Sequence, residues 1–363
     1  MSQGTGCRWH EVYRVLHYSL ISAMLRVGNE SVGVQFRDGI AGPTRGQNGT
    51  RPRGPNAFKL IAAVVLLPLL TVQPATAAVF GSDGRVPLPA QRRALLGDKI
   101  GALVNAHTRQ VCTAFCVSDR VIGTAGHCVI GKEGGSQPRL SDFWFRLAMA
   151  ADKSQVALAE IGGGDDLLIA HRPLSLRPPI AATSDWAFVR LSAPACTAGG
   201  LKIAPRPADE ISDAAKAGRV YQVGFHRDFG FAELTDSGPC PVNREFPSAP
   251  AAMIEREFAS PEHLLLHHCA TGAGSSGAPL LIDGADGPEV VGIGVGTYVI
   301  SKVALEGARV VHRYSSDPVA NTAVSATAFA EQLESFLKGD PGLARGPLRR
   351  TPRGPLIETG ATR

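Results

Sequence analysis

The segment Thr271-Gly272-Ala273-Gly274-Ser275-Ser276-Gly277-Ala278-Pro279-Leu280 is a glycine-rich turn that leads directly into an apolar strand. Glycine adopts backbone conformations closed to other residues, so such a turn can present one serine at a sharp bend and aim its amides at a bound group. We expect Ser276 to be a nucleophile and the N–H groups of Gly274 and Ser276 to stabilise an oxyanion. A Gly/Ser turn alone is more often only a turn, so the interpretation depends on the rest of the chain.

A histidine follows a second apolar strand, in Val121-Ile122-Gly123-Thr124-Ala125-Gly126-His127-Cys128. A neutral imidazole placed there can accept a proton from a serine hydroxyl. The alternative is a loop histidine without a partner. Cys128 weakens that alternative, because a disulfide to Cys112 would brace the strands that present His127, at about 3 kcal/mol on the chain-entropy model.

An acid opens a third apolar strand, in Thr183-Ser184-Asp185-Trp186-Ala187-Phe188-Val189-Arg190-Leu191. A buried aspartate needs a partner, and an imidazole N–H would provide one. The alternative is an aspartate that caps a turn, with Asp165 and Asp166 as rival acids. We prefer Asp185, because the sequence GGGDD around the rivals is typical of an exposed loop.

The three segments come in the chain order His, Asp, Ser. TAGHC, SDWAFVRL and GSSGAPL resemble the signature segments of the trypsin-like (chymotrypsin-fold) serine peptidases, including their bacterial glutamyl-endopeptidase-like branch, over about residues 79 to 337. The resemblance implies an all-β fold of two six-stranded antiparallel barrels packed face to face, with a C-terminal helix. It also implies a serine endopeptidase that works through an acyl-enzyme, with His127 as general base and acid, Asp185 as its orienter and Ser276 as nucleophile.

The same resemblance suggests a substrate pocket lined by Ala270, Thr271, Gly294 and Gly296. Ala270 stands where trypsin has an aspartate, which argues against a preference for Arg or Lys. Thr271 resembles a threonine of glutamyl endopeptidases, but Gly294 stands in place of their histidine. Small or apolar side chains fit such a pocket, and the cleavage specificity stays open. Ser275 replaces the acid that pairs with the new N-terminus in trypsin.

The remaining cysteines fit the resemblance in part. Cys240 and Cys269 are expected to form a disulfide behind the nucleophile loop. Cys116 is expected to be a free buried thiol, and Cys196 has no evident partner. Because no two CxxC pairs occur, a structural zinc site is not expected. The acyl-enzyme mechanism that the resemblance implies needs no metal or organic cofactor.

Basic residues, an apolar run and Ala75-Thr76-Ala77 form a signal-peptide pattern, which predicts cleavage after Ala77 and a secreted or periplasmic protein. The expected organisation is a disordered leader or mispredicted start at 1–57, a signal peptide at 58–77, and a peptidase domain at 78–338. Within that domain we expect barrels at about 78–195 and 196–325 and a helix at 326–337. A disordered basic tail would follow at 339–363.

The composition favours short strands over a helical bundle, since 41 Gly and 26 Pro residues occur among 363 residues. The formal net charge is +5, but arginines cluster near both ends rather than on one central face, so nucleic-acid binding is not expected. We expect a monomer without a stable membrane anchor after signal cleavage, acting on protein or peptide substrates.

Two alternatives come from other classes. An inactive exported homologue would bind peptides or proteins without cutting them, but the three catalytic residue types are all present. An esterase of the α/β-hydrolase type would have the order Ser, acid, His and a G-x-S-x-G turn before a helix. Neither esterase feature occurs, because the Ser276 turn is followed by a strand pattern.

Overall fold

The computed structural model describes residues 11–17, 78–130, 138–148, 156–157, 166–170, 178–229, 233–306 and 309–339. The chain divides into two compact units, Met1–Leu20 with Ala75–Arg363 and Ile21–Pro74, and every described residue belongs to the first. The expected signal peptide at 58–77 and residues 340–363 of the expected tail lie outside the described residues. Within the described ranges, no helix has the length and apolar character needed to cross a bilayer.

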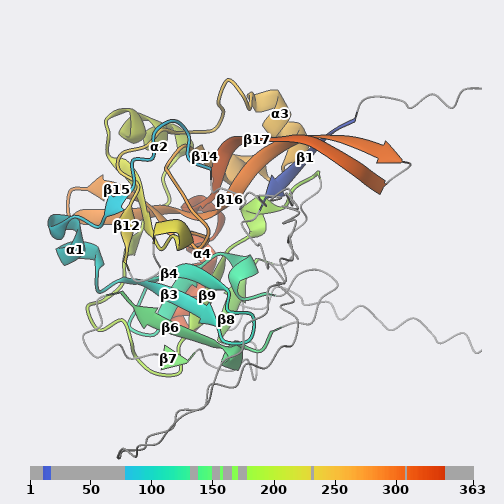
Figure 1. The fold of residues 1–363 in the computed structure, drawn as a ribbon. Coiled ribbons are helices and arrows are strands. Elements are labelled where there is room, and N and C mark those ends of the chain that lie inside the picture. Colours follow the sequence, from blue (N-terminus) through green and yellow to red (C-terminus); the bar gives the residue numbers. More distant parts are fainter. Residues whose placement is uncertain are drawn as a thin grey trace, which may run out of the picture. The chain divides into compact units, whose positions relative to one another are not determined.

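In the described part of the chain the first sheet has seven strands, all paired antiparallel, in the order β7-β6-β3-β4-β5-β9-β8. Figure 1 labels β3, β4, β6, β7, β8 and β9 of this sheet. Its central strands are short apolar runs that are almost entirely buried, as expected for strands covered on both faces. The strands are β3 (Ile100–Asn105), β4 (Val111–Cys116), β5 (Val121–Thr124), β6 (Phe143–Leu147), β7 (Val156–Ala157), β8 (Leu167–Ile169) and β9 (Ala187–Arg190).

The second sheet has ten strands, with the path β13-β14-β17-β16-β15-β11-β12-β2 and with β1 and β10 paired to β16. Its pairs are antiparallel except for the short β10–β16 pair. The strands are β1 (Glu11–His17), β2 (Val86–Pro87), β10 (Lys202–Ile203), β11 (Val220–Gly224), β12 (Thr235–Asp236), β13 (Val242–Asn243), β14 (Leu264–His267), β15 (Pro279–Gly284), β16 (Gly287–Glu306) and β17 (Arg309–Ser325).

Four α-helices are described, and the C-terminal one matches the predicted helix. They are α1 (Ala90–Leu96), α2 (Ala208–Lys216), α3 (Ala251–Glu257) and α4 (Ala330–Lys338). The predicted stretch begins as a 3₁₀ turn at Ala326–Ala328, and Gly339 ends α4 in the left-handed conformation. α4 buries Leu333 and Phe336, whereas Leu337, expected on the same side, is 39% exposed.

Aromatic packing fastens the C-terminal segment to the first sheet. Trp186, Phe188 and Phe329 lie with ring centroids 5.1 to 5.9 Å apart, and the Arg190 guanidinium lies over the Phe336 ring. The last helix of the chain therefore supports strand β9, which follows directly after Asp185.

The all-β fold of two antiparallel sheets with a C-terminal helix is confirmed, but the strand counts differ from two sets of six. Strand β2 pairs with β12 of the second sheet, so the segment just after residue 78 does not join the first sheet. The Leu88 N–H bonds the Leu234 carbonyl and Arg92 pairs with Asp236, which hold this segment there.

Within residues 1–57, only strand β1 is described; it pairs along β16 from Glu11 opposite Val303 to His17 opposite Thr297, as its β-favouring sequence EVYRVLH allows. The leader or mispredicted start at 1–57 stays a prediction. One further expectation is corrected. Cys116 is not a free thiol, because it forms a disulfide with Cys196. The chain after β9 returns to β4, where the Leu201 N–H bonds the Cys116 carbonyl.

Candidate active site

His127 and Asp185 are brought together by the pairing of two neighbouring strands. His127 lies in a 3₁₀ turn, Gly126–Cys128, just after β5, and Asp185 lies just before β9. Because Thr124 of β5 pairs with Ala187 of β9, the residues that extend beyond these strands meet at one edge of the first sheet. The two side chains thus occupy one site although they are far apart in sequence.

The Asp185 carboxylate holds His127 at two points. Its Oδ2 lies 2.7 Å from His127 Nδ1, and its Oδ1 accepts the His127 backbone N–H at 2.7 Å. An ionised carboxylate only accepts hydrogen bonds, so the proton of a neutral His127 is on Nδ1, which leaves Nε2 as a base. The side chains are 8% and 1% exposed, so the pair is shielded from water. A Cβ on Gly126 would lie 3.0 Å from Oδ1 and crowd the carboxylate.

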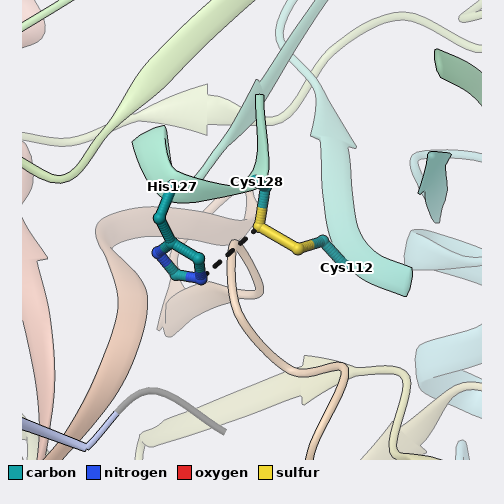
Figure 2. Close-up of side chains that lie close together, drawn as sticks. All are labelled: Cys112, His127 and Cys128. Carbon is teal, nitrogen blue, oxygen red and sulfur yellow. Dashed lines mark hydrogen bonds between the residues drawn. A yellow bond between two sulfur atoms is a disulfide. The ribbon is translucent and has the colours of Figure 1, made fainter. Parts of the chain in front are cut away.

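A disulfide between Cys112 and Cys128 anchors the histidine turn to strand β4 (Figure 2). Cys128 Sγ lies 3.8 Å from His127 Nε2, and the three side chains form a compact group. The two sulfurs are bonded to each other and are not thiolates, so we assign no metal site to this group.

The Ser276 turn is fixed to the first sheet by Thr113 of β4. The Thr113 N–H bonds the Ser276 carbonyl at 2.9 Å, and its Oγ1 donates to the Gly274 carbonyl at 2.9 Å. Gly277 has φ +85°, and a Cβ there would lie 2.2 Å from both the Thr113 carbonyl and Thr124 Oγ1. The turn therefore fits closely against the strand that leads to His127. Thr113 was not predicted from the sequence; its signal is a threonine inside the apolar run VCTAFC.

Two amides of this turn are available to a ligand. The N–H groups of Ser275, Gly277 and Ala278 bond carbonyls of the protein. Across the described part of the chain, no hydrogen bond uses the N–H of Gly274 or Ser276. Free amides of the nucleophile's own residue and of the residue two before it can bind a negatively charged oxygen.

A charged cluster supports the turn from behind at Gly272. Arg85 pairs with Asp83 and Asp228, both at 2.7 Å, and hydrogen bonds from Arg85 lower the pKa of both carboxyls. A Cβ on Gly272 would lie 2.4 Å from the Asp228 carboxylate. Burial, aided by the positive charge of Arg85, lowers the pKa of His226 to about 3. The cluster therefore presents neutral His226 and a tightly held arginine to the turn.

A pocket opens beside Ser276. The predicted residues Thr271, Gly294 and Gly296 line it, whereas Ala270 is buried and is not among the lining residues. Four polar side chains that line the pocket were not predicted from the sequence, namely Gln222 of β11, His267 of β14, and Asn321 and Thr322 of β17. Each has the pattern of an ordinary strand residue, so no local signal marks it.

The polar lining does not support the expectation of small or apolar substrate side chains. A Cβ on Gly294 would lie 2.1 Å from Gln222 Nε2, so Gln222 fills the space that a larger residue 294 would need. Burial lowers the pKa of His267 to about 3, so this imidazole is neutral near pH 7.

The back of the pocket is braced by Cys269 and by the segment near the predicted cleavage point. Cys240 and Cys269 form a disulfide. Asn321 Nδ2 donates to the carbonyls of Cys269 at 2.8 Å and Ala78 at 3.1 Å. Its Oδ1 accepts from Thr297 Oγ1 at 2.7 Å. Asn321 is therefore fully engaged and acts as a rigid wall.

The comparison with known protein families agrees with the resemblance. A family model described as trypsin-like peptidase domain matches residues 112–293, half of the chain. The chain therefore belongs to the family of trypsin-like peptidase domains. A solved structure titled "Structure of Glu endopeptidase in complex with MPD" aligns with a TM-score of 0.45 and 17% identity, covering 72% of this chain and 98% of that chain. No curated protein sequence matches.

Proposed function

We propose that this trypsin-like peptidase is a serine endopeptidase that cuts proteins through an acyl-enzyme, with His127, Asp185 and Ser276 as its catalytic triad. The observation that carries the proposal is the buried Asp185–His127 pair, with 2.7 Å between Oδ2 and Nδ1, beside a serine turn that Thr113 ties to the same sheet. Export to the periplasm or the medium is part of the proposal, and three disulfides support it.

In the first half of the reaction, Ser276 Oγ attacks the carbonyl carbon of the scissile bond while His127 Nε2 takes the hydroxyl proton. The amides of Gly274 and Ser276 bind the oxygen that becomes negative. Asp185 stabilises the imidazolium and keeps the ring in position. The C–N bond then breaks as His127 returns the proton to the departing amine, which leaves an ester on Ser276.

In the second half, a water molecule attacks the ester while His127 Nε2 takes one of its protons. The tetrahedral intermediate collapses, Ser276 Oγ recovers the proton, and the acid product leaves. Every step uses groups of this chain and water, so the proposed reaction needs no metal or organic cofactor.

Hydrolysis of an unfolded protein tests this proposal. The full-length chain is expressed with its own leader into an oxidising periplasm, purified, and incubated with reduced, alkylated casein. We expect cleavage by the wild type and by Ser275→Ala, and a loss of about 10⁴-fold or more in Ser276→Ala. Equal cleavage by wild type and Ser276→Ala would contradict the proposal. A folded wild type that binds peptides without cutting them would identify a binding protein instead.

A further inference from the structure

Three residues that line the pocket beside Ser276 each carry a buried side-chain atom without a hydrogen-bond partner in the described part of the chain. The atoms are Gln222 Oε1, His267 Nδ1 and Thr322 Oγ1. The three side chains are each at most 2% exposed and come from three different strands. Native proteins seldom leave buried polar groups unpaired, and each one costs about 1 to 3 kcal/mol. Three such atoms in one pocket indicate that a ligand completes their hydrogen bonds.

We infer that this pocket selects a side-chain carboxamide, glutamine or asparagine, at the residue whose carbonyl is cut. The inference rests on the proposed function, because it places the residue before the scissile bond in the pocket next to Ser276. A carboxamide has two N–H donors and one carbonyl acceptor. The pocket has an acceptor in Gln222 Oε1, a hydroxyl in Thr322 that donates or accepts, and a ring nitrogen in His267. The two sets are complementary.

The orientation of Gln222 makes the pocket selective. Its Nε2 faces the Ala278 carbonyl at 3.5 Å, which turns Oε1 to the other side as a pure acceptor. A carboxylate would place a second acceptor against Oε1 and gain no hydrogen bond from it. The described lining also contains no Lys or Arg to neutralise a carboxylate. An acidic side chain is therefore disfavoured relative to the amide.

Other substrate classes fit less well. A lysine or arginine side chain would bury its charge without a counter-ion, because no Asp or Glu is among the lining residues. An apolar side chain would leave the three buried polar atoms without hydrogen-bond partners. Sites built to hydrogen-bond a substrate group reject analogues that lack the group much more strongly than apolar pockets reject a wrong size.

A set of quenched fluorescent peptides that differ only at the residue before the cut tests the inference. The residues are Gln, Asn, Glu, Lys and Met, with Met as the near-isosteric apolar partner of Gln. The full-length protein, exported and purified as above, is assayed at pH 7.5. We expect kcat/KM for Gln or Asn to exceed that for Met by about 100-fold and that for Glu by about 10-fold or more.

Variants show whether the named atoms cause the preference. Gln222→Met and His267→Leu should each lower the Gln-to-Met ratio of kcat/KM by about 10-fold or more. The ratio is taken within one variant, so a general loss of activity cancels, and either variant suffices if the other fails to fold. Lys216→Ala, on the exposed side of α2, is the control and should leave the ratio unchanged.

The outcomes separate this inference from the proposed function. Cleavage that prefers Glu, Lys or Met overturns the carboxamide inference while the peptidase proposal stands. Unchanged ratios in both pocket variants also overturn it. A folded wild type that cuts none of the peptides, nor casein, overturns both.

Discussion

The proposed catalytic pair and the proposed substrate pocket differ in whether their polar atoms have hydrogen-bond partners. Both Asp185 oxygens have partners at 2.7 Å. In the pocket, the polar atoms of Gln222, His267 and Thr322 named above have none. The first arrangement fixes a proton donor and acceptor before substrate arrives. In the proposed pocket, the unpaired atoms are left for a substrate to bond. The protein is therefore less stable than it would be with these atoms paired.

The largest expected effect comes from changing the fully hydrogen-bonded pair of Asp185 and His127. Asp185→Asn keeps the size of the side chain but cannot stabilise the imidazolium or hold the same tautomer, so kcat should fall by about 10⁴-fold at pH 7.5. The measurement is kcat on a peptide that the wild type cleaves. Asp166→Asn is the control, because Asp166 lies 3.9 Å from Arg190 and away from His127, and it should change kcat by less than about twofold. A similar loss in both variants would contradict the assignment.

The next effect tests how tightly the serine turn is held. Gly277→Ala puts a Cβ within 2.2 Å of the backbone of β4 at φ +85°, so the turn must move. We expect the free energy of unfolding to fall by about 3 kcal/mol or more and turnover to fall at least 10-fold.

Gly199→Ala provides a matched control for that prediction. Gly199 has φ +84° and no atom within 4 Å of its added Cβ. Gly199→Ala therefore measures only the cost of placing alanine in a left-handed backbone conformation, about 1 to 2 kcal/mol. Urea unfolding and kcat measure both variants. Equal effects of the two substitutions would show that the close fit of Gly277 contributes nothing.

Two buried threonines allow a hydroxyl with hydrogen-bond partners to be compared directly with a hydroxyl that has none. Thr113 and Thr322 are both 0% exposed, but Thr113 Oγ1 bonds the Gly274 carbonyl and the Phe225 N–H, whereas Thr322 Oγ1 has no partner. Thr113→Val should lower the free energy of unfolding by about 1 to 3 kcal/mol. Thr322→Val should raise it by about 1 kcal/mol, because a valine needs no hydrogen bond. If both substitutions lowered the free energy of unfolding, the proposed difference in hydrogen bonding between Thr113 and Thr322 would be contradicted.

The last prediction concerns the pH dependence of stability. The pKa values of His226 and His267 are lowered to about 3 by burial, against about 6.5 for a histidine in the unfolded chain. Above pH 6.5 both states are neutral. As the pH falls below 6.5, the unfolded chain binds protons that the folded chain does not, so each histidine lowers the free energy of unfolding by about 1.4 kcal/mol per pH unit.

Urea unfolding between pH 6.5 and 4.5 measures this slope. His226→Asn should reduce this slope by about 1.4 kcal/mol per pH unit, and His267→Asn should reduce it by the same amount. Asp83 and Asp228, whose pKa values are also lowered, contribute only at more acidic pH, near the ordinary range of carboxyls. Unchanged slopes in both variants would contradict the buried neutral histidines.

The sequence predicted the all-β fold and the C-terminal helix because these depend on local patterns. Short apolar runs separated by turn residues indicate strands, and the helical spacing of Leu333 and Phe336 indicates the helix. His127, Asp185 and Ser276 were found because each lies in a short recognisable segment, next to the strand that presents it. Their joint role in catalysis stays a prediction.

The pocket and the bond between Cys116 and Cys196 could not be predicted in this way. Gln222, His267 and Thr322 meet only because β11, β14 and β17 belong to one sheet, and each has the pattern of an ordinary strand residue. The sequence predicted a free buried thiol at Cys116. The disulfide to Cys196 was not predicted, because the two residues meet only where the chain returns to β4 after β9. Contacts across distant strands depend on topology, which local sequence does not determine.

The most direct test of the central claim is labelling with a fluorophosphonate, which reacts with serines activated as nucleophiles. The exported full-length protein and its Ser276→Ala, Ser275→Ala and His127→Ala variants are treated with the probe, and the modified peptide is identified by mass spectrometry. We expect labelling at Ser276 in the wild type and in Ser275→Ala, and no labelling in Ser276→Ala or His127→Ala. Labelling at Ser275, or labelling that is independent of His127, would contradict it.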